Sequence, residues 1–391
     1  MFRLALFVGF CYLINSVATA PSPIAPRGNS AEPLLPSEDN FYTAPDGFEE
    51  TAPGTIFCIR SAPGNITTVI ANTSAAYNIV YRTTDSNYAP SWAVTTILSP
   101  LQNNTAKGNI SHHSLLSLQT AYNTANHDST PSLMLYCAAS QTSLGIPWTA
   151  DDISAALGNG WYVNMSDHEG PLSSFGLGVE EGHETLNSKI IASDKETNTF
   201  AAELHEQYAP EMHFSGMAIG VFFLQSILGI TFQNGVAREY LISCLEPLGP
   251  YNSTAFLAAL NYDVNVAFAA YYKQDICDYF IGGPSDLQAS VIQDIANRNS
   301  NEGYHGTPLI PVFAYKVIHE TVNTLGTLLT RWCGISVDVR YDRNEVGRHI
   351  TDITNGRLRA LEWLKGVFKG HMVQNGCEVK NLTVTLTDNT R

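Results

Sequence analysis

Runs of apolar residues in the first half of the chain predict β-strands. The stretches AAYNIVYRTT and SWAVTTILSP are rich in β-branched and aromatic residues, and the polar stretch DSNYAP separates them. Two such runs joined by a short segment with Asp, Asn and Pro predict a β-hairpin over residues 75–100. SLLSLQTAY predicts a further strand, which a polar loop follows at Asn123.

Strands then alternate with helices. Thr149 and Asp152 form a capping-box-like start to a helix over Thr149–Leu157, which Gly158 and Gly160 end. WYVNM predicts a strand, SDHEG a loop and GVEEGHETLNSKII a helix. This order is typical of a mainly parallel sheet whose strands are connected by crossover helices, so the fold class is α/β.

Residues 221–300 have helical spacing of apolar residues, interrupted by Pro and Gly. The stretches VFFLQSILGITF, REYLISCLEPLGP and STAFLAALNYDVNVAFAAYYKQDICDYF carry this pattern. It indicates a helical insertion. Composition alone favours additional core, and a cap over an apolar pocket is the alternative.

The N-terminus is typical of an exported chain. Arg3 precedes the apolar core Leu4–Ile14, and the small residues Ala18-Thr19-Ala20 fit a cleavage site, so residues 1–20 are predicted to be a signal peptide. No later run reaches the length of a membrane span, so no transmembrane anchor is expected. The proline-rich residues 21–54 predict an extended leader. The residues after the signal peptide suffice for one large α/β domain with insertions or for two smaller domains, and the pattern becomes globular over residues 55–391.

Charge and cysteine content limit the function. The net charge of −15 argues against nucleic acid and anionic membranes as partners, and suits a secreted enzyme acting on neutral or cationic material. Six cysteines remain after Cys11 leaves with the signal, which suggests disulfides, and the lack of a CxxC pair argues against zinc. Passage through a glycosylating pathway is supported by sequons at Asn65, Asn72, Asn103, Asn109, Asn164, Asn252 and Asn381.

An acid and a histidine follow two consecutive strands predicted near the C-terminus. Glu320 comes after the strand of PLIPVFAYKVI, and His349 lies in the loop after a strand predicted over Ile335–Tyr341. This order is the one that α/β-hydrolases use. There the histidine accepts the proton of the nucleophile, and the acid fixes the tautomer of the imidazole. A surface-loop histidine is the alternative interpretation of His349.

Several segments, in order, resemble one family. YNIVYRTTDSNYAPSWAVTTIL, ASQTSLGIPWTADDISAALGNGWYVNMSDHEGP, GVEEGHETLNS, LHEQYAPEM, LGPYNSTAFLAAL, IPVFAYKVIHE and GRHITD are similar to segments of the fungal secretory lipases of the yeast lipase A type. The resemblance implies an α/β-hydrolase with a mainly parallel sheet and a helical cap over about residues 221–300. It also implies hydrolysis of acylglycerol or related esters, at a possible lipid–water interface and without a cofactor or metal.

The resemblance also assigns single residues. His349 matches the family histidine, and Glu320 falls at the position of the acid. Asn123 stands where the family usually has an aspartate that contributes to the oxyanion site. Cys333 and Cys377 flank His349 in positions that resemble a family disulfide. The pairing of Cys58, Cys137, Cys244 and Cys277 stays open.

The nucleophile of the family is absent from the expected place. The family carries its serine in a Gly-x-Ser-x-Gly elbow just before the helix that ends YAPE, and this chain contains no such motif. Ser193 is a weak candidate, because Ser193-Asp-Lys-Glu196 reads better as a capping box. A second shortening follows SGMAIG, where Gly220 runs directly into VFFLQS. The sheet is therefore expected to be incomplete at the nucleophile strand.

Three functional hypotheses follow. The chain is a secreted monomeric lipase or esterase by descent with Glu320 and His349 as surviving triad members, a lipid-binding protein without catalysis, or a chain that does not fold stably. The missing elbow reflects either a degenerate member of the family or a translation that skips exon pieces. The transcript distinguishes these two origins.

Overall fold

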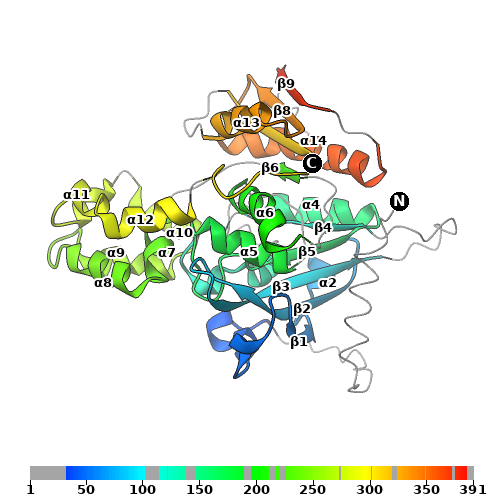
Figure 1. Ribbon diagram of the computed structural model, residues 1–391. Coiled ribbons are helices and arrows are strands. Elements are labelled where there is room, and N and C mark those ends of the chain that lie inside the picture. Colours follow the sequence, from blue (N-terminus) through cyan, green and yellow to red (C-terminus); the bar gives the residue numbers. More distant parts are fainter. Residues whose placement is uncertain are drawn as a thin grey trace.

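The computed structural model describes residues 32–101, 114–120, 122–137, 146–188, 195–210, 217–219, 226–272, 274–300, 302–318, 324–347, 349–371 and 375–384. Among these residues the strands form two sheets (Figure 1). The first sheet contains β1 (Ile56–Ser61), β2 (Thr73–Thr84), β3 (Pro90–Pro100), β4 (Leu115–Ser117) and β5 (Tyr162–Ser166). The second contains β6 (Met217–Ile219), β7 (Val312–Val317), β8 (Val339–Asn344) and β9 (Cys377–Leu382).

The strand orders are β1-β2-β3-β5-β4 and β6-β7-β8-β9. β2 and β3 form an antiparallel pair from Thr73 to Pro100, which confirms the predicted hairpin. β4 and β5 are parallel, as are all the pairs of the second sheet. The edge strands β4 and β6 therefore each belong to a parallel pair, and no described strand joins them.

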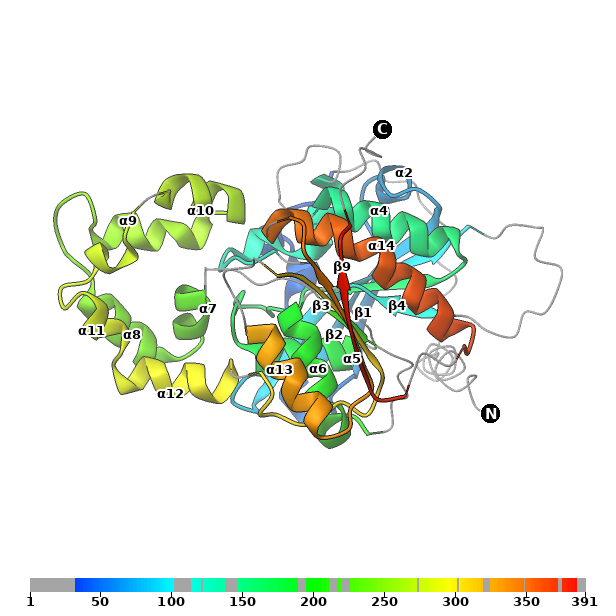
Figure 2. The same ribbon diagram turned by 90° about the horizontal axis from the view of Figure 1, so that it is seen from above.

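Helices cover both faces of the sheets (Figure 2). On one face lie α4 (Ile146–Gly158) and α14 (His349–Phe368); on the other lie α5 (Gly178–Ser188), α6 (Lys195–Tyr208) and α13 (Thr324–Gly334). The short helices α2 (Ile66–Val69) and α3 (Pro131–Met134) precede α4. This arrangement of helices on both faces of a sheet is the α/β architecture predicted from the sequence.

A lobe of helices lies beside the sheets (Figures 1 and 2). It contains α7 (Ser226–Phe232), α8 (Gly235–Cys244), α9 (Ser253–Leu257), α10 (Val264–Tyr271), α11 (Pro284–Leu287) and α12 (Ser290–Asn299). Its apolar centre includes Leu241, Phe256 and Phe280. Residues 226–300 are thus helical, as predicted, and this lobe is called the cap below.

The segment before β1 contains three short 3-10 turns, Pro36–Glu38, Asn40–Tyr42 and Phe48–Glu50, rather than being extended throughout. Asp39 forms an ion pair with Arg60 of β1 at 2.7 Å. This ion pair holds the segment against β1 of the first sheet.

Helix α14 packs on β6, β7 and α4, and one buried cluster thereby links the two sheets. Its Trp363 and Leu364 share one buried cluster with Val163 of β5 and with Phe313 of β7. The approach is closest at Gly356, where an added methyl group would overlap the ring of Tyr315 on β7. Only glycine allows helix and strand to come this close.

Gly356→Ala is expected to lower the free energy of unfolding by about 1–3 kcal/mol, because the new methyl group overpacks the interface with Tyr315. Gly366→Ala, in the same helix, is the matched control. Nothing lies within 4 Å of its added carbon, and alanine favours a helix, so it should stabilise by about 0.5–1 kcal/mol. Urea unfolding measures both, and equal effects of the two substitutions would contradict the packing described.

Two element boundaries differ from the predictions. α4 begins at Ile146 and not at Thr149, whose hydroxyl lies 2.8 Å from that of Thr120. β8 runs over Val339–Asn344, later than predicted, and His349 is the first residue of α14 and not a loop residue. The strand continues because its polar residues are buried with partners: Asp342 accepts from Arg359 at 3.0 Å, and Asn344 donates to the carbonyl of Val384 at 3.2 Å.

One sequon lies inside the first sheet. Asn164 of β5 is 0% exposed, and its amide nitrogen donates to the hydroxyls of Ser117 and Ser188. We expect Asn164 to carry no glycan in the folded protein, because a buried amide has no room for one, whereas the exposed Asn65 can accept one. Peptide mass spectrometry after enzymatic deglycosylation in oxygen-18 water tests this. A modified Asn164 in folded material would contradict the position of β5.

Candidate functional site: two C-terminal loops and an interrupted sheet

The acid and histidine loops start at the same edge of the second sheet. β7 and β8 are neighbouring parallel strands, and their last residues Val317 and Asn344 are paired. Glu320 follows β7 by three residues and lies outside the described residues. His349 follows β8, and the structure describes its backbone at the start of α14. Because the carboxyl ends of parallel strands meet at one edge, both loops begin there.

The turn before His349 is fixed by Asn344. The side-chain oxygen of Asn344 accepts from the amides of Val346 (3.3 Å) and Val384 (3.0 Å). Gly347 has a φ of 115°, which favours glycine and directs the chain into α14. A buried amide with three bonds thus positions the start of the helix that carries His349.

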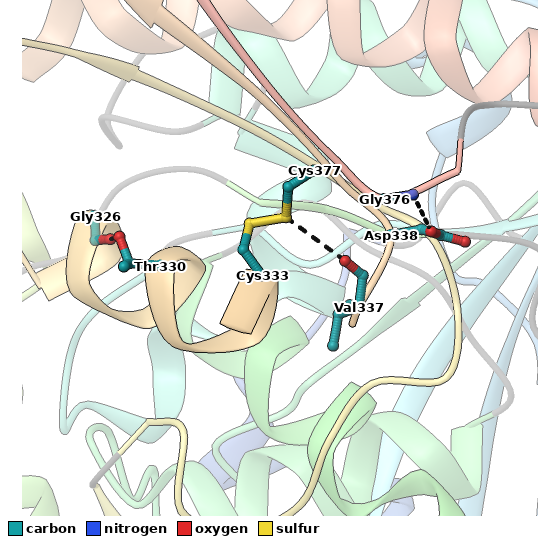
Figure 3. Close-up of a disulfide and its surroundings, with 7 residues drawn as sticks. All are labelled: Gly326, Thr330, Cys333, Val337, Asp338, Gly376 and Cys377. Atoms are coloured by element: carbon teal, nitrogen blue, oxygen red, sulfur yellow. Dashed lines mark hydrogen bonds between the residues drawn. A yellow bond between two sulfur atoms is a disulfide. The ribbon is translucent and has the colours of Figure 1, made fainter. Parts of the chain in front are cut away.

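A disulfide joins the two ends of this region (Figure 3). Cys333 in the last turn of α13 is bonded to Cys377 at the start of β9, with a Cα–Cα distance of 5.6 Å. Next to it, the amide of Gly376 donates to the carboxylate of Asp338 at 2.5 Å. The bridge expected from the family resemblance is therefore present, and the loop that it closes contains β8 and α14. Cys58, Cys244 and Cys277 are not bridged.

Asn123 follows β4 in the first sheet. Its φ of 47° places it in the left-handed region, which asparagine tolerates better than most residues. Both neighbours are anchored: the Tyr122 hydroxyl accepts from the amide of Glu169 at 3.0 Å, and Thr124 donates to the carbonyl of Tyr262 in the cap at 2.6 Å. Asn123 thus lies where core and cap meet, close to the turn after β5.

That turn holds three buried ionisable residues that the sequence analysis did not select. Asp167 accepts from the amide and the hydroxyl of Ser132 at 2.7 and 2.6 Å, and burial raises the pKa of Asp167 to about 7. Burial lowers the pKa of His168 to about 4, so its imidazole is neutral, and its ring packs edge-on against Tyr122. Glu169 is 1% exposed. Charged residues directly after a strand were the signal available.

Helices α5 and α6 run parallel to one another. Gly178 packs on the ring of Phe200, Gly182 lies against Leu204, and Asn187 donates to the Tyr208 hydroxyl at 2.8 Å. Parallel helices on one face of a sheet normally flank a strand that returns the chain to its starting edge.

The sequence between α5 and α6 is too short to supply that strand and an elbow. The pairing of Gly178 with Phe200 places Lys195 level with a point about 15 helical residues before Ser188. At about 1.5 Å per residue of helix, the chain must return about 22 Å along the helix axes. The six residues 189–194 provide seven Cα–Cα steps between Ser188 and Lys195, which reach at most about 25 Å when fully extended. No residues are left for a strand followed by a Gly-x-Ser-x-Gly turn, and the candidate Ser193 lies outside the described residues.

The separation of the strands into two sheets agrees with a missing nucleophile strand. β4 is the last strand of the first sheet, and β6 is the first strand of the second. The segment between α5 and α6 comes after β5 and before β6 in the chain, as a strand between the two edges would. In the described part of the chain, the strands and helices that would flank the nucleophile strand of a hydrolase are present, and no described strand lies between β4 and β6.

Comparison with known proteins decides the family. The family model described as secretory lipase matches residues 139–199. The Trichothecene C-3 esterase of Fusarium sporotrichioides is 35% identical over 438 aligned residues, which cover 99% of this chain and 94% of the relative. This chain belongs to the fungal secretory lipase family.

Other members are similar over most of their length. A probable trichothecene esterase of Stachybotrys chartarum is 34% identical, covering 91% of this chain and 82% of the relative. Lipase A of Arthroderma benhamiae is 28% identical, covering 98% and 90%. Among solved structures, Candida antarctica lipase A has a TM-score of 0.75 at 19% identity, covering 90% of this chain and 91% of that chain. The α/β-hydrolase fold implied by the resemblance is confirmed.

The length of the alignment shows that one relative is longer than this chain within the shared region. The alignment with the Fusarium esterase spans 438 positions, whereas this chain has 391 residues. The relative therefore carries residues that have no counterpart here.

The described residues offer neither a metal-binding cluster nor a membrane-spanning helix. They contain no group of three or more His, Cys, Asp or Glu side chains placed to hold a metal ion. Among them, no helix is both long and apolar enough to cross a membrane.

Proposed function

We propose that this protein is an exported carboxylic-ester hydrolase by descent that recognises an ester but, in this form of the chain, does not cleave it. Glu320 and His349 are its acid and base, and Asn123 lies at the oxyanion side. The observation that carries the proposal is the six-residue connection between the parallel helices α5 and α6. It leaves no place for the strand and turn that present a serine.

The chemistry follows from which groups remain. In a complete site, the imidazole accepts the serine proton, the acid stabilises the imidazolium, and backbone amides bind the oxyanion. Without the serine no acyl-enzyme forms, so the covalent route is closed. Glu320 and His349 then contribute only to the polar surface near the ester. No cofactor takes part in this scheme.

The ester class is proposed from the relatives. The two relatives that are 35% and 34% identical are named trichothecene esterases, and the relatives named lipases are 28% identical or less. We propose that a trichothecene ester at C-3, rather than a long-chain triacylglycerol, is the preferred ligand. The cap, with its apolar centre around Leu241 and Phe256, is the element proposed to contact it.

Binding and turnover measured on the same sample test this function. Calorimetry should show binding of a trichothecene C-3 ester without release of acid, and weaker binding of a triacylglycerol. His349→Ala should leave the absence of turnover unchanged. Turnover that His349→Ala abolishes would contradict the loss of the covalent step, and failure to bind any ester would contradict recognition. A transcript that restores Gly-x-Ser-x-Gly before FAAELHEQ would identify a longer, catalytic form.

A further inference from the structure

Helix α5 carries two carboxyl groups on one buried face. Glu180 and Glu184 are one helical turn apart and are 1% and 0% exposed. A methyl carbon added at Gly170 would lie 2.6 Å from Glu184 Oε1 and 2.8 Å from Glu180 Oε1. Both oxygens therefore point at the same place in the turn after β5, and this pair is called the carboxyl pair below.

The carboxyl pair has few partners within the described part of the chain. Glu180 Oε1 and both carboxyl oxygens of Glu184 make no well-formed hydrogen bond there. The amide of Gly170 donates to the carbonyl of Asp167 and lies near enough to the Glu184 carboxyl to act on it. The backbone amides of Ser86 and Gly170 partly offset the burial of the pair. The titratable groups that act on the pair from β2, the β2–β3 turn, the turn after β5, α5 itself and α6 are all acids. They are Tyr81, Asp85, Tyr122, Asp167, Glu181 and Tyr208.

Burial favours the protonated form of the carboxyl pair, because no positively charged group among the causes of the shift compensates an ionised carboxylate. Burial is the main cause that raises the pKa of Glu180 to about 8, and Asp85 and Glu181 raise it further. The pKa of Glu184 is raised well above its ordinary value, first by burial and then by Glu180. Two buried carboxylates at this distance cannot both be ionised at low cost.

The carboxyl pair is bonded to the cap. The side-chain amide of Gln233, directly after α7, donates to Glu180 Oε2, and its oxygen accepts from the Ser86 hydroxyl in the β2–β3 turn. The turn after β5 also meets the cap, because Gly229 of α7 packs on the backbone of Phe175 and Ser300 donates to the carbonyl of Gly176. The same turn thus contacts the pair on one side and the cap on the other.

We propose that Glu180 and Glu184 form an acid-closed latch between the hydrolase core and the cap. While the pair holds a proton, α7 stays seated on the turn after β5. Loss of protons leaves buried carboxylates, and water can solvate them at the Gln233 contact only if α7 moves away. The latch is independent of the proposed ester ligand.

The direction of the pH effect follows from proton linkage. The closed state binds a proton up to a pH of about 8, whereas a solvated glutamate in the open state releases it near 4.5. Closure is therefore strongest below about pH 4.5 and is lost as the pH rises to about 8. Within this window each carboxyl that is protonated in the closed state and ionised in the open state lowers the ratio of closed to open molecules by up to about tenfold per pH unit.

Hydrogen exchange measured by mass spectrometry tests the latch. After correction for intrinsic rates, opening of peptides from residues 226–240 should increase by up to about tenfold per unit for each of the two carboxyls between pH 5 and pH 8. Peptides from β7 should keep their protection. Glu184→Gln and Glu180→Gln each remove one ionisable group with little change in shape, and each should reduce the dependence to that of the remaining carboxyl. Glu362→Gln, at an exposed glutamate of α14, is the matched control and should keep it.

Three results would overturn the latch. These are a pH-independent cap in the unaltered chain, an unchanged dependence in both glutamine variants, and loss of protection in β7 together with the cap. The last result would indicate global unfolding rather than release of α7.

Discussion

Inserting a strand and a Gly-x-Ser-x-Gly elbow between Ser188 and Lys195 is expected to produce an esterase that depends on His349. The insert would be the corresponding segment of an active relative, such as the Fusarium esterase. The physical reason is that α5 and α6 already run parallel, and that β4 and β6 already offer two edges for a strand. Removing the nucleophile of a serine hydrolase costs on the order of 10⁶ in kcat, so the gain available is of similar size.

Nitrophenyl ester hydrolysis measures this gain. The matched controls are the same insert with its serine changed to alanine, and the insert combined with His349→Ala; both should remove the new activity. A cooperatively folded insertion variant without turnover would contradict the proposed positions of Glu320 and His349. Equal turnover by the chain without the insert would contradict the loss of the nucleophile.

Removing the disulfide with Cys333→Ala and Cys377→Ala together should lower the free energy of unfolding by about 4 kcal/mol. The bridge joins residues 44 positions apart, so it restricts the unfolded chain, and the chain-entropy model gives this value for such a loop. Urea unfolding under oxidising conditions measures the loss. The result also bears on His349, because the closed loop contains β8 and the start of α14.

Cys58→Ala is the control for the disulfide, since Cys58 is exposed and not bridged. Its unfolding free energy should change by less than about 0.5 kcal/mol. A double variant that is as stable as the Cys58 variant would show that the bridge between α13 and β9 does not restrict the chain in solution.

Local patterns in the sequence predicted the elements whose residues interact with near neighbours. The β2–β3 hairpin, β5 and α5 follow from apolar runs, turn residues and helical spacing within each segment. The gap in the sheets was also predictable, because a missing motif of known position implies a missing strand. These features need no knowledge of distant contacts.

The boundaries that were wrong depend on residues far apart in the sequence. Polar Asp342 and Asn344 suggest the end of a strand, yet Arg359 and Val384 provide partners that keep them inside β8. This moved the start of the following loop and placed His349 in a helix. Sequence periodicity contains no signal for such partners.

The carboxyl pair was missed for a related reason. Glutamates on a helix are normally assigned to its solvated face, and Glu180 and Glu184 instead face the turn after β5. Only the packing of that turn and the cap over α5 shows that they are buried. Burial of this kind depends on tertiary structure, and ionisable groups with a strongly shifted pKa are often functional.

We propose that no serine of this chain acts as a nucleophile. Labelling with a fluorophosphonate, followed by peptide mass spectrometry, tests this directly, because the reagent reacts with serines activated by a neighbouring imidazole. We predict no labelled serine in the folded chain, with or without His349→Ala. Stoichiometric labelling of one serine that is lost on His349→Ala would contradict the proposed loss of the nucleophile.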